Sequence, residues 1–225
     1  GYSSAASDVY KRQASMRVKS TFSKYSGMRN HMGLTGAQAA ERVLHGAGIY
    51  DVRIERVAGN LTDHYDPRNK VLRLSDATYG QCSVAAVGVA AHECGHAIQH
   101  ARGYAPLQFR SALVPVANFG SMIAWPLIVL GLFINSQSSA MIINIGILAF
   151  SLAVLFQLVT LPVEYNASGR AVRILAETGM MQGEEIVATK KVLNAAALTY
   201  VASAAAAILQ LVRILILTGG RRRDD

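Results

Sequence analysis

Five consecutive residues carry the most specific chemical pattern in the chain. His92-Glu93-Cys94-Gly95-His96 matches the pattern H-E-x-x-H. Residues four apart on a helix share one face, so both imidazoles can reach a single metal ion. Glu93 stands between them, where its carboxylate can take a proton from a water molecule held at the metal. The pattern therefore predicts a zinc (Zn2+) site with His92 and His96 as ligands and Glu93 as the general base of a hydrolase.

A catalytic zinc ion takes three protein ligands and keeps a fourth position open. Glu164 is the candidate third ligand, because it follows a long apolar stretch and opens a polar segment that can return to the site helix. By itself, Glu164 is also compatible with a helix-capping carboxylate at a membrane interface. A third histidine in an extended H-E-x-x-H pattern would stand at position 102, which is Arg102. Site-2-type intramembrane proteases use an aspartate from a later apolar segment, and none stands between Asp76 and Asp224.

Five further residues have weaker assignments. His100 lies one turn beyond the second histidine, too far along a straight helix to join the same ion, which favours a supporting or surface position. Asn166 and Arg170 are candidates for orienting the third ligand or binding substrate, or they belong to a solvated interface. Tyr165, Arg170 and His64 are candidates for stabilising an oxyanion, and the place of His64 beside a turn is more typical of a surface residue.

The elements that must position these residues follow from local patterns. A helix is predicted over residues 83–101, with the histidines in its second half and Gly103 ending it. An earlier helix should begin at Thr35, whose hydroxyl can cap it. The segment 51–57 alternates apolar and charged residues, and the segment 61–76 indicates two short strands around a turn at 66–69. We therefore expect a small antiparallel sheet before the site helix, and its strand near 71–74 is a candidate for aligning an extended peptide.

Long uncharged stretches predict about three transmembrane helices. No charged residue stands between Ser111 and Val163, whereas a soluble helix needs a polar face. Each apolar stretch approaches or exceeds the roughly 20 residues that a bilayer core requires. The expected organisation is a leader over 1–13, a cytoplasmic zincin-like part over 14–111, a transmembrane hairpin over 112–163, polar helices with the third ligand over 164–194, a third span over 195–218 and a tail over 219–225. The fold class is mainly α, with a small sheet.

The charge pattern supports a membrane protein. The formal net charge is +8 and the isoelectric point about 9.7, yet basic residues are not interleaved with aromatic ones as in single-strand nucleic-acid binders. Basic flanks beside membrane spans, in contact with the lipid bilayer, explain the excess better. Lysine and arginine near the span ends place the site on the cytoplasmic side of the cell membrane, although three terminal arginines oppose this. The two cysteines, Cys82 and Cys94, form no ligand pattern and fit a reducing compartment.

Three long strings resemble one protein family. They are AVGVAAHECGHAIQHARGYAPLQFRSALVPVANFGS, LAVLFQLVTLPVEYNAS and LTDHYDPRNKVLRLSD, and they resemble the YugP-like neutral zinc metallopeptidases of bacterial membranes over nearly the whole chain from about Arg17 to Arg223. The resemblance implies a zinc-dependent membrane peptidase with Glu164 as third ligand, as in HtpX-type gluzincins. The family pattern also has a membrane helix before the segment RVKS, where this chain has GYSSAASDVYKRQ, and a basic residue at the position of Gly169. Residues 1–13 are polar and show no apolar period, so they are interpreted as a disordered or foreign leader.

Two other classes of function compete with a metallopeptidase acting on a peptide or protein substrate. A membrane scaffold could hold zinc for structure and cleave nothing, but a structural site would fill all four zinc positions with protein ligands and would not need Glu93. A substrate-gated transporter has little support, because the apolar stretches lack paired charges.

Overall fold

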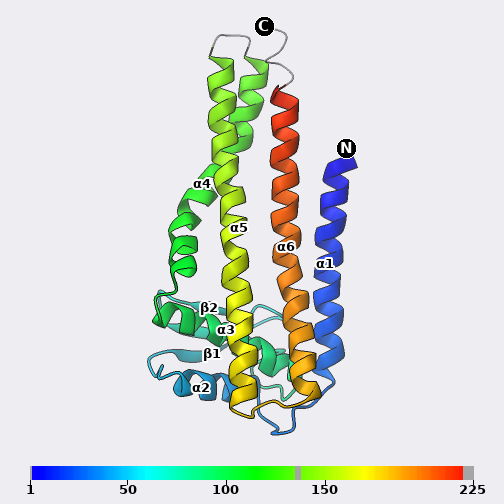
Figure 1. The fold of residues 1–225 in the computed structure, drawn as a ribbon, viewed down its shortest axis with the longest axis vertical. Helices are drawn as coiled ribbons and strands as arrows, with labels where there is room; N and C mark the ends of the chain where they lie inside the picture. The colour runs from blue at the N-terminus through cyan, green and yellow to red at the C-terminus, as the bar shows by residue number, and fades with distance from the viewer. Residues whose placement is uncertain (1, 135–137, 220–225) are drawn as a thin grey trace. The chain divides into compact units, whose positions relative to one another are not determined.

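The computed structural model describes residues 2–134 and 138–219, which fold mainly as helices with one small sheet (Figure 1). The chain divides into two compact units, one of residues 1–11, 108–162 and 200–225 and the other of residues 12–107 and 163–199. In chain order, the elements are α1 (Tyr2–Ser26), α2 (Gly36–Gly46), β1 (Arg53–Val57), β2 (His64–Asp66), β3 (Val71–Ser75), α3 (Val84–Ala101), α4 (Ala105–Phe133), α5 (Ser139–Glu177) and α6 (Glu184–Gly219).

The three longest helices of the described residues confirm the predicted membrane spans. Helices α4, α5 and α6 have 29, 39 and 36 residues and are apolar enough to cross a bilayer. The structure differs from the expected boundaries, because α5 runs without a break from the second apolar stretch into the polar segment that begins at Glu164. Pro162 lies inside it and removes only one backbone hydrogen bond, which a membrane helix tolerates. Likewise, α6 joins the expected polar helix and the third span into one helix.

The segment interpreted from the sequence as a disordered or foreign leader is described from residue 2 onward. Residues 2–13 lie in α1, which continues to Ser26. Parts of the expected linker at 135–139 and of the tail at 219–225 lie outside the described residues.

The three-stranded sheet is mixed, so the expectation of an antiparallel sheet is wrong for one of its two pairings. The strand order is β1-β3-β2, with β2 antiparallel and β1 parallel to β3. The hairpin between β2 and β3 follows from the predicted turn at 66–69. On its other side, β3 pairs with β1, and these two strands run in the same direction. Sequence patterns locate strands but do not state which neighbours pair, and here the pairing is not sequential.

One face of the sheet packs into the core of the second unit. Leu72 and Leu74 of β3 are fully buried in the same apolar cluster as Val43 and Leu44 of α2. The expected cap of α2 is confirmed as a capping box, in which Gln38 N–H donates to Thr35 Oγ1 and Thr35 N–H donates to the Gln38 side chain. Helix α3 is capped in a similar way by Ser83, whose Oγ accepts from Ala86 N–H, and its buried side lines the same cluster.

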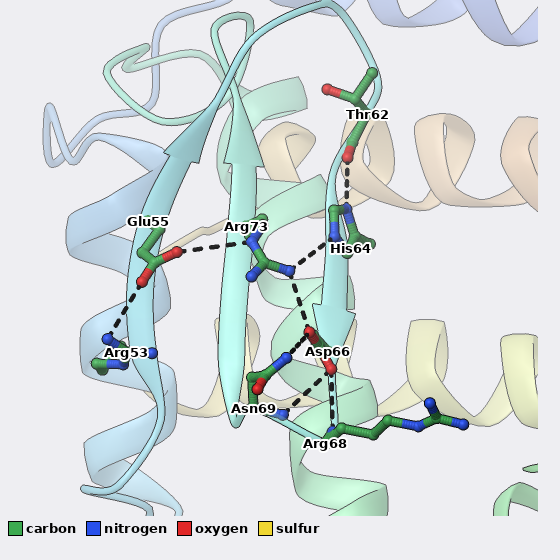
Figure 2. Close-up of polar contacts among 8 residues, drawn as sticks. All are labelled: Arg53, Glu55, Thr62, His64, Asp66, Arg68, Asn69 and Arg73. Atoms are coloured by element: carbon green, nitrogen blue, oxygen red, sulfur yellow. Dashed lines mark hydrogen bonds and ion pairs between the residues drawn. The ribbon is translucent and has the colours of Figure 1, made fainter.

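The opposite face of the sheet carries a ladder of charged side chains (Figure 2). Arg73 on the central strand lies between Glu55 of β1, at 3.6 Å, and Asp66 of β2, at 3.2 Å. Arg53 extends the ladder at 3.6 Å from Glu55. His64 lies at its end, with Nε2 at 3.4 Å from Arg73. All these groups are exposed or partly exposed, so the ladder is a solvated surface rather than a reactive site.

Candidate metal centre

The site begins with a close approach of two helices in the second unit. A Cβ atom placed on Gly95 of α3 would lie only 2.6 Å from the carbonyl oxygen of Ala167 and 3.0 Å from its Cα. No real side chain fits at that distance. Glycine at position 95, the second x of H-E-x-x-H, therefore allows α3 to lie directly against α5. The face of α3 that carries the histidines is thereby brought to the turn of α5 that contains Glu164.

Three predicted ligands meet at this crossing. Glu164 Oε2 lies 3.2 Å from His92 Nε2 and 3.5 Å from His96 Nε2. The ligand atoms of the three residues all lie within 4.8 Å of one another. The imidazole rings are 4.8 Å apart between centroids and nearly perpendicular. Their side chains are largely buried, with the Glu164 side chain only 3% exposed.

The chemistry of this donor set fits zinc. Two imidazole nitrogens and one carboxylate oxygen form a ligand set typical of a catalytic zinc site, which leaves one position for water or substrate. Buried carboxylates and imidazoles at such distances are otherwise expensive, unless a proton or a cation lies between them. The group therefore fits the metal that the sequence predicted, with Glu164 as the third member.

Each histidine has a supporting partner on its other ring nitrogen, and both partners were missed in the sequence. His92 Nδ1 lies 3.0 Å from Ser168 Oγ, and His96 Nδ1 lies 3.0 Å from Gln99 Oε1. Metal-binding histidines commonly use their second nitrogen in this way. Helical spacing could have suggested both partners, because Ser168 follows Glu164 by one turn and Gln99 follows His96 by three residues.

Asn166 and Arg170 belong to the network behind His96. The Gln99 amide donates to the Val163 carbonyl at 2.8 Å and to Asn166 Oδ1 at 3.0 Å. Arg170 Nε donates to the same Asn166 oxygen at 2.7 Å. The Arg170 guanidinium also lies over the ring of Tyr104, 5.8 Å from its centroid. The structure therefore connects both residues to a predicted ligand through Gln99.

The charges around His96 favour its protonated form in the absence of a metal. Burial lowers the pKa of His96, but the hydrogen bond to Glu164 and the negative charges of Glu93 and Glu164 outweigh burial and raise it above its usual value. Glu93 is half-buried. Within the described part of the chain, its carboxylate has no hydrogen bond or ion pair to a protein group. Burial raises the pKa of the Cys94 thiol well above its usual value, so this cysteine is an inert core residue.

Three of the candidates lie outside the metal group. His100 is exposed, and its Nδ1 is 2.9 Å from the Tyr65 hydroxyl of β2. Tyr165 is 48% exposed. His64 belongs to the charged ladder on the outer face of the sheet, which agrees with the interpretation as a surface residue (Figure 2).

The central position of β3 corrects one expectation about substrate alignment. This strand is paired by β1 on one side and by β2 on the other. It therefore has no free edge to accept an extended peptide. The expectation that the segment near 71–74 aligns a peptide is thus wrong. Within the described residues, the outer strands of this sheet are β1 and β2, and β2 is connected to α3 by the Tyr65–His100 hydrogen bond.

Three apolar helices long enough to span a bilayer, together with two histidines and a glutamate that could hold a metal ion, fit the class of membrane metalloproteins. Comparison with known proteins makes the class specific. The model of the family described as "Putative neutral zinc metallopeptidase" matches residues 7–219. The chain is also 47% identical over 209 residues to "Putative membrane protease YugP" of Bacillus subtilis (strain 168), which covers 92% of each protein. No solved structure matches the chain significantly. The chain belongs to this family of zinc metallopeptidases.

Proposed function

We propose that the chain is a membrane-embedded, zinc-dependent peptidase that hydrolyses peptide bonds at the His92–His96–Glu164 group. The single observation that carries the proposal is the convergence of these three ligand atoms within 4.8 Å of one another. Membership of the family supports the same activity. The three residues would hold zinc through His92 Nε2, His96 Nε2 and a Glu164 carboxylate oxygen.

The chain's own residues would divide the catalytic work as follows. When bound, zinc would act as a Lewis acid, lowering the pKa of the attacking water toward neutrality and polarising the scissile carbonyl. Glu93 takes the proton of the attacking water and delivers it to the leaving amine. Ser168 and Gln99 hold the two imidazoles from behind, and close packing at Gly95 holds the α3 face against Glu164.

Exchange of Glu93 for glutamine separates catalysis from metal binding. Glu93→Gln keeps the size of the side chain but removes its basicity, so hydrolysis should be lost while the zinc content remains at one ion per chain. Cleavage of a peptide library by the detergent-purified protein, measured beside metal analysis, provides both readouts. His92→Ala and Glu164→Ala should lose zinc and activity together. A Glu164→Ala protein that retained tightly bound zinc would contradict the ligand assignment.

The same experiment tests the alternative of a zinc-binding scaffold. A scaffold predicts that the wild-type protein binds zinc, hydrolyses none of the peptides with or without added metal, and behaves like Glu93→Gln. Metal-dependent hydrolysis that disappears in Glu93→Gln excludes it.

We further propose that the site faces the cytoplasm, because six basic residues flank the span ends on its side: Arg102, Arg110, Arg170, Arg173, Lys190 and Lys191. Reporter enzymes active on only one side of the membrane, fused after residue 225 or inserted between α4 and α5, measure the topology. Both positions should report the extracytoplasmic side, and a cytoplasmic signal at both would reverse the assignment.

A further inference from the structure

The two histidines of the metal group are not held in equivalent ways. Both use Nε2 toward Glu164 and Nδ1 toward a supporting partner. The partner of His92 is the hydroxyl of Ser168, which can either donate or accept a hydrogen bond. This contact is therefore compatible with either neutral tautomer of His92. The partner of His96 is an amide, and its surroundings decide which of its two ends faces the ring.

The orientation of the Gln99 amide is determined by its neighbours. One end of the amide lies 2.8 Å from the backbone carbonyl of Val163, which can only accept a hydrogen bond. That end must consequently be the NH2 group, and the end that faces His96 must be the oxygen. Because Gln99 Oε1 can only accept, His96 Nδ1 must carry the proton.

Asn166 and Arg170 strengthen the same orientation from behind. A guanidinium has only donors, so the Asn166 atom that faces Arg170 Nε at 2.7 Å must be the oxygen. That oxygen also accepts from the Gln99 NH2 group at 3.0 Å. Donors and acceptors are thus fixed throughout this network. Arg170 and Gln99 both donate to Asn166 Oδ1, and Gln99 Oε1 accepts from His96. Gln99, at the centre of this network, is fully buried, whereas Asn166 and Arg170 are partly exposed.

We propose that Gln99, Asn166 and Arg170 form a positioning relay that fixes neutral His96 as its Nδ1–H tautomer, with the Nε2 lone pair directed at the metal position before a metal binds. The proposal rests on the proposed zinc site and adds three residues to it. They are positioning residues, because they act through His96. Preorganisation of this ligand removes the cost of choosing a tautomer and a ring orientation when the metal binds.

The direct test is the tautomer of His96 in the metal-free protein. Histidine labelled with 15N gives distinct NMR shifts for a protonated and an unprotonated ring nitrogen, and a pH well above the histidine pKa keeps the rings neutral. In the detergent-purified, zinc-free protein, His96 should be a single Nδ1–H form. Gln99→Met removes both the acceptor and the donor at similar size, so His96 should become a mixture of tautomers. A single Nδ1–H form that persisted in Gln99→Met would overturn the proposal.

Asn166 provides a conservative rescue. Asn166→Asp keeps an oxygen that accepts from both Gln99 and Arg170, whereas Asn166→Leu accepts from neither. Zinc affinity, measured by competition with a chromophoric chelator, should fall by about 10- to 100-fold in Gln99→Met and Asn166→Leu, the usual effect of losing a group behind a metal ligand. Asn166→Asp should remain close to the wild type. Equal loss in both Asn166 variants would show that the relay's polarity has no role.

Asn30→Leu is the matched control for the loss of a buried amide. Asn30 is 2% exposed, and its amide donates to two backbone carbonyls, those of Leu34 and Cys82. The Gln99 amide likewise makes two donor contacts, to the Val163 carbonyl and to Asn166 Oδ1. Its replacement should destabilise the same folded unit without changing the His96 tautomer or zinc affinity. A changed tautomer in Asn30→Leu would mean that general loosening, rather than the relay, explains the Gln99 result. Failure of the wild-type protein to bind zinc would instead contradict the proposed function, while the tautomer measurement would still decide the relay.

Discussion

The close approach at Gly95 makes one substitution informative about the whole site. In Gly95→Ala, the new methyl group would begin 2.6 Å from the Ala167 carbonyl oxygen, whereas ordinary contact starts at 3.4 Å. The atoms it meets are backbone, so no side-chain rotation can relieve the overlap. Helix α3 must therefore move away from α5 by about 0.8 Å at this point.

The expected magnitudes follow from two opposing effects. Overpacking of a tight interior contact costs about 1–3 kcal/mol, and alanine in a helix gains about 0.5–1 kcal/mol over glycine. The net loss of stability should therefore be modest, from near zero to about 2.5 kcal/mol. Zinc binding should suffer more, because metal–ligand distances tolerate only about 0.2 Å of deviation. We expect a loss of at least about tenfold in zinc affinity, comparable with the loss of a group behind a ligand.

Gly169 of α5 provides a matched control five residues beyond Glu164. It is exposed, and a Cβ added there meets nothing within 4 Å. Gly169→Ala should therefore stabilise the helix by about 0.5–1 kcal/mol and leave zinc affinity unchanged. Chelator competition and thermal unfolding in detergent, applied to both variants, measure the two quantities. Wild-type zinc affinity in Gly95→Ala would refute the conclusion that this crossing of α3 and α5 sets the metal geometry.

Three further predictions concern the cap, the ladder and the metal. Thr35→Ala removes the capping box of α2 and should lower the free energy of unfolding by about 1 kcal/mol without changing zinc affinity, as denaturant titration would show. Hydrogen bonds, chiefly from Asn69 and also from Arg73, lower the pKa of Asp66 from 3.8 to about 2. A lowered carboxyl pKa stabilises the fold at a pH above the pKa of the unfolded state. This stabilisation should therefore be lost as the pH falls from about 4 to about 2, and it should be absent in Asp66→Asn. Removal of zinc by a chelator should lower the melting temperature at neutral pH. The difference in melting temperature between zinc-loaded and metal-free protein should shrink on acidification. The raised pKa of His96 stabilises the metal-free fold at a pH below the pKa of the unfolded state, and this stabilisation is lost as the pH rises through the pKa of the folded state. An unchanged difference in melting temperature at acidic pH would contradict this.

Local patterns were sufficient for the parts of the site that depend on one helix or one segment. The spacing of His92 and His96 places them on one helix face, and the length of the uncharged stretches predicts the transmembrane helices. Glu164 could be proposed because it opens a polar segment at the end of an apolar stretch, where the chain can return to the site helix, and because the family resemblance implies it. These predictions rest on helical geometry and on the cost of burying charge, which a single sequence expresses directly.

Non-local contacts were beyond the same patterns. The parallel pairing of β1 with β3 joins strands that are not neighbours along the chain, so alternation within each strand contains no information about it. The interaction of Gln99 with Val163 and Asn166 depends on the crossing of α3 and α5. A glutamine on an apolar helix indicates only that some partner must exist, because buried amides require hydrogen bonds.

The relay and the buried glutamate together define what can occupy the centre of the site. With Nδ1 of His96 committed to Gln99, the only ring position left for a second proton is Nε2, which faces Glu164. A zinc ion would bind to the same nitrogen and the same carboxylate. Proton and metal are therefore alternative ways to balance the buried negative charge, and they compete for one position. The apparent zinc affinity must consequently rise with pH until His96 is neutral, and the supporting residues that direct Nε2 inward determine both how firmly the proton is held and how readily zinc replaces it.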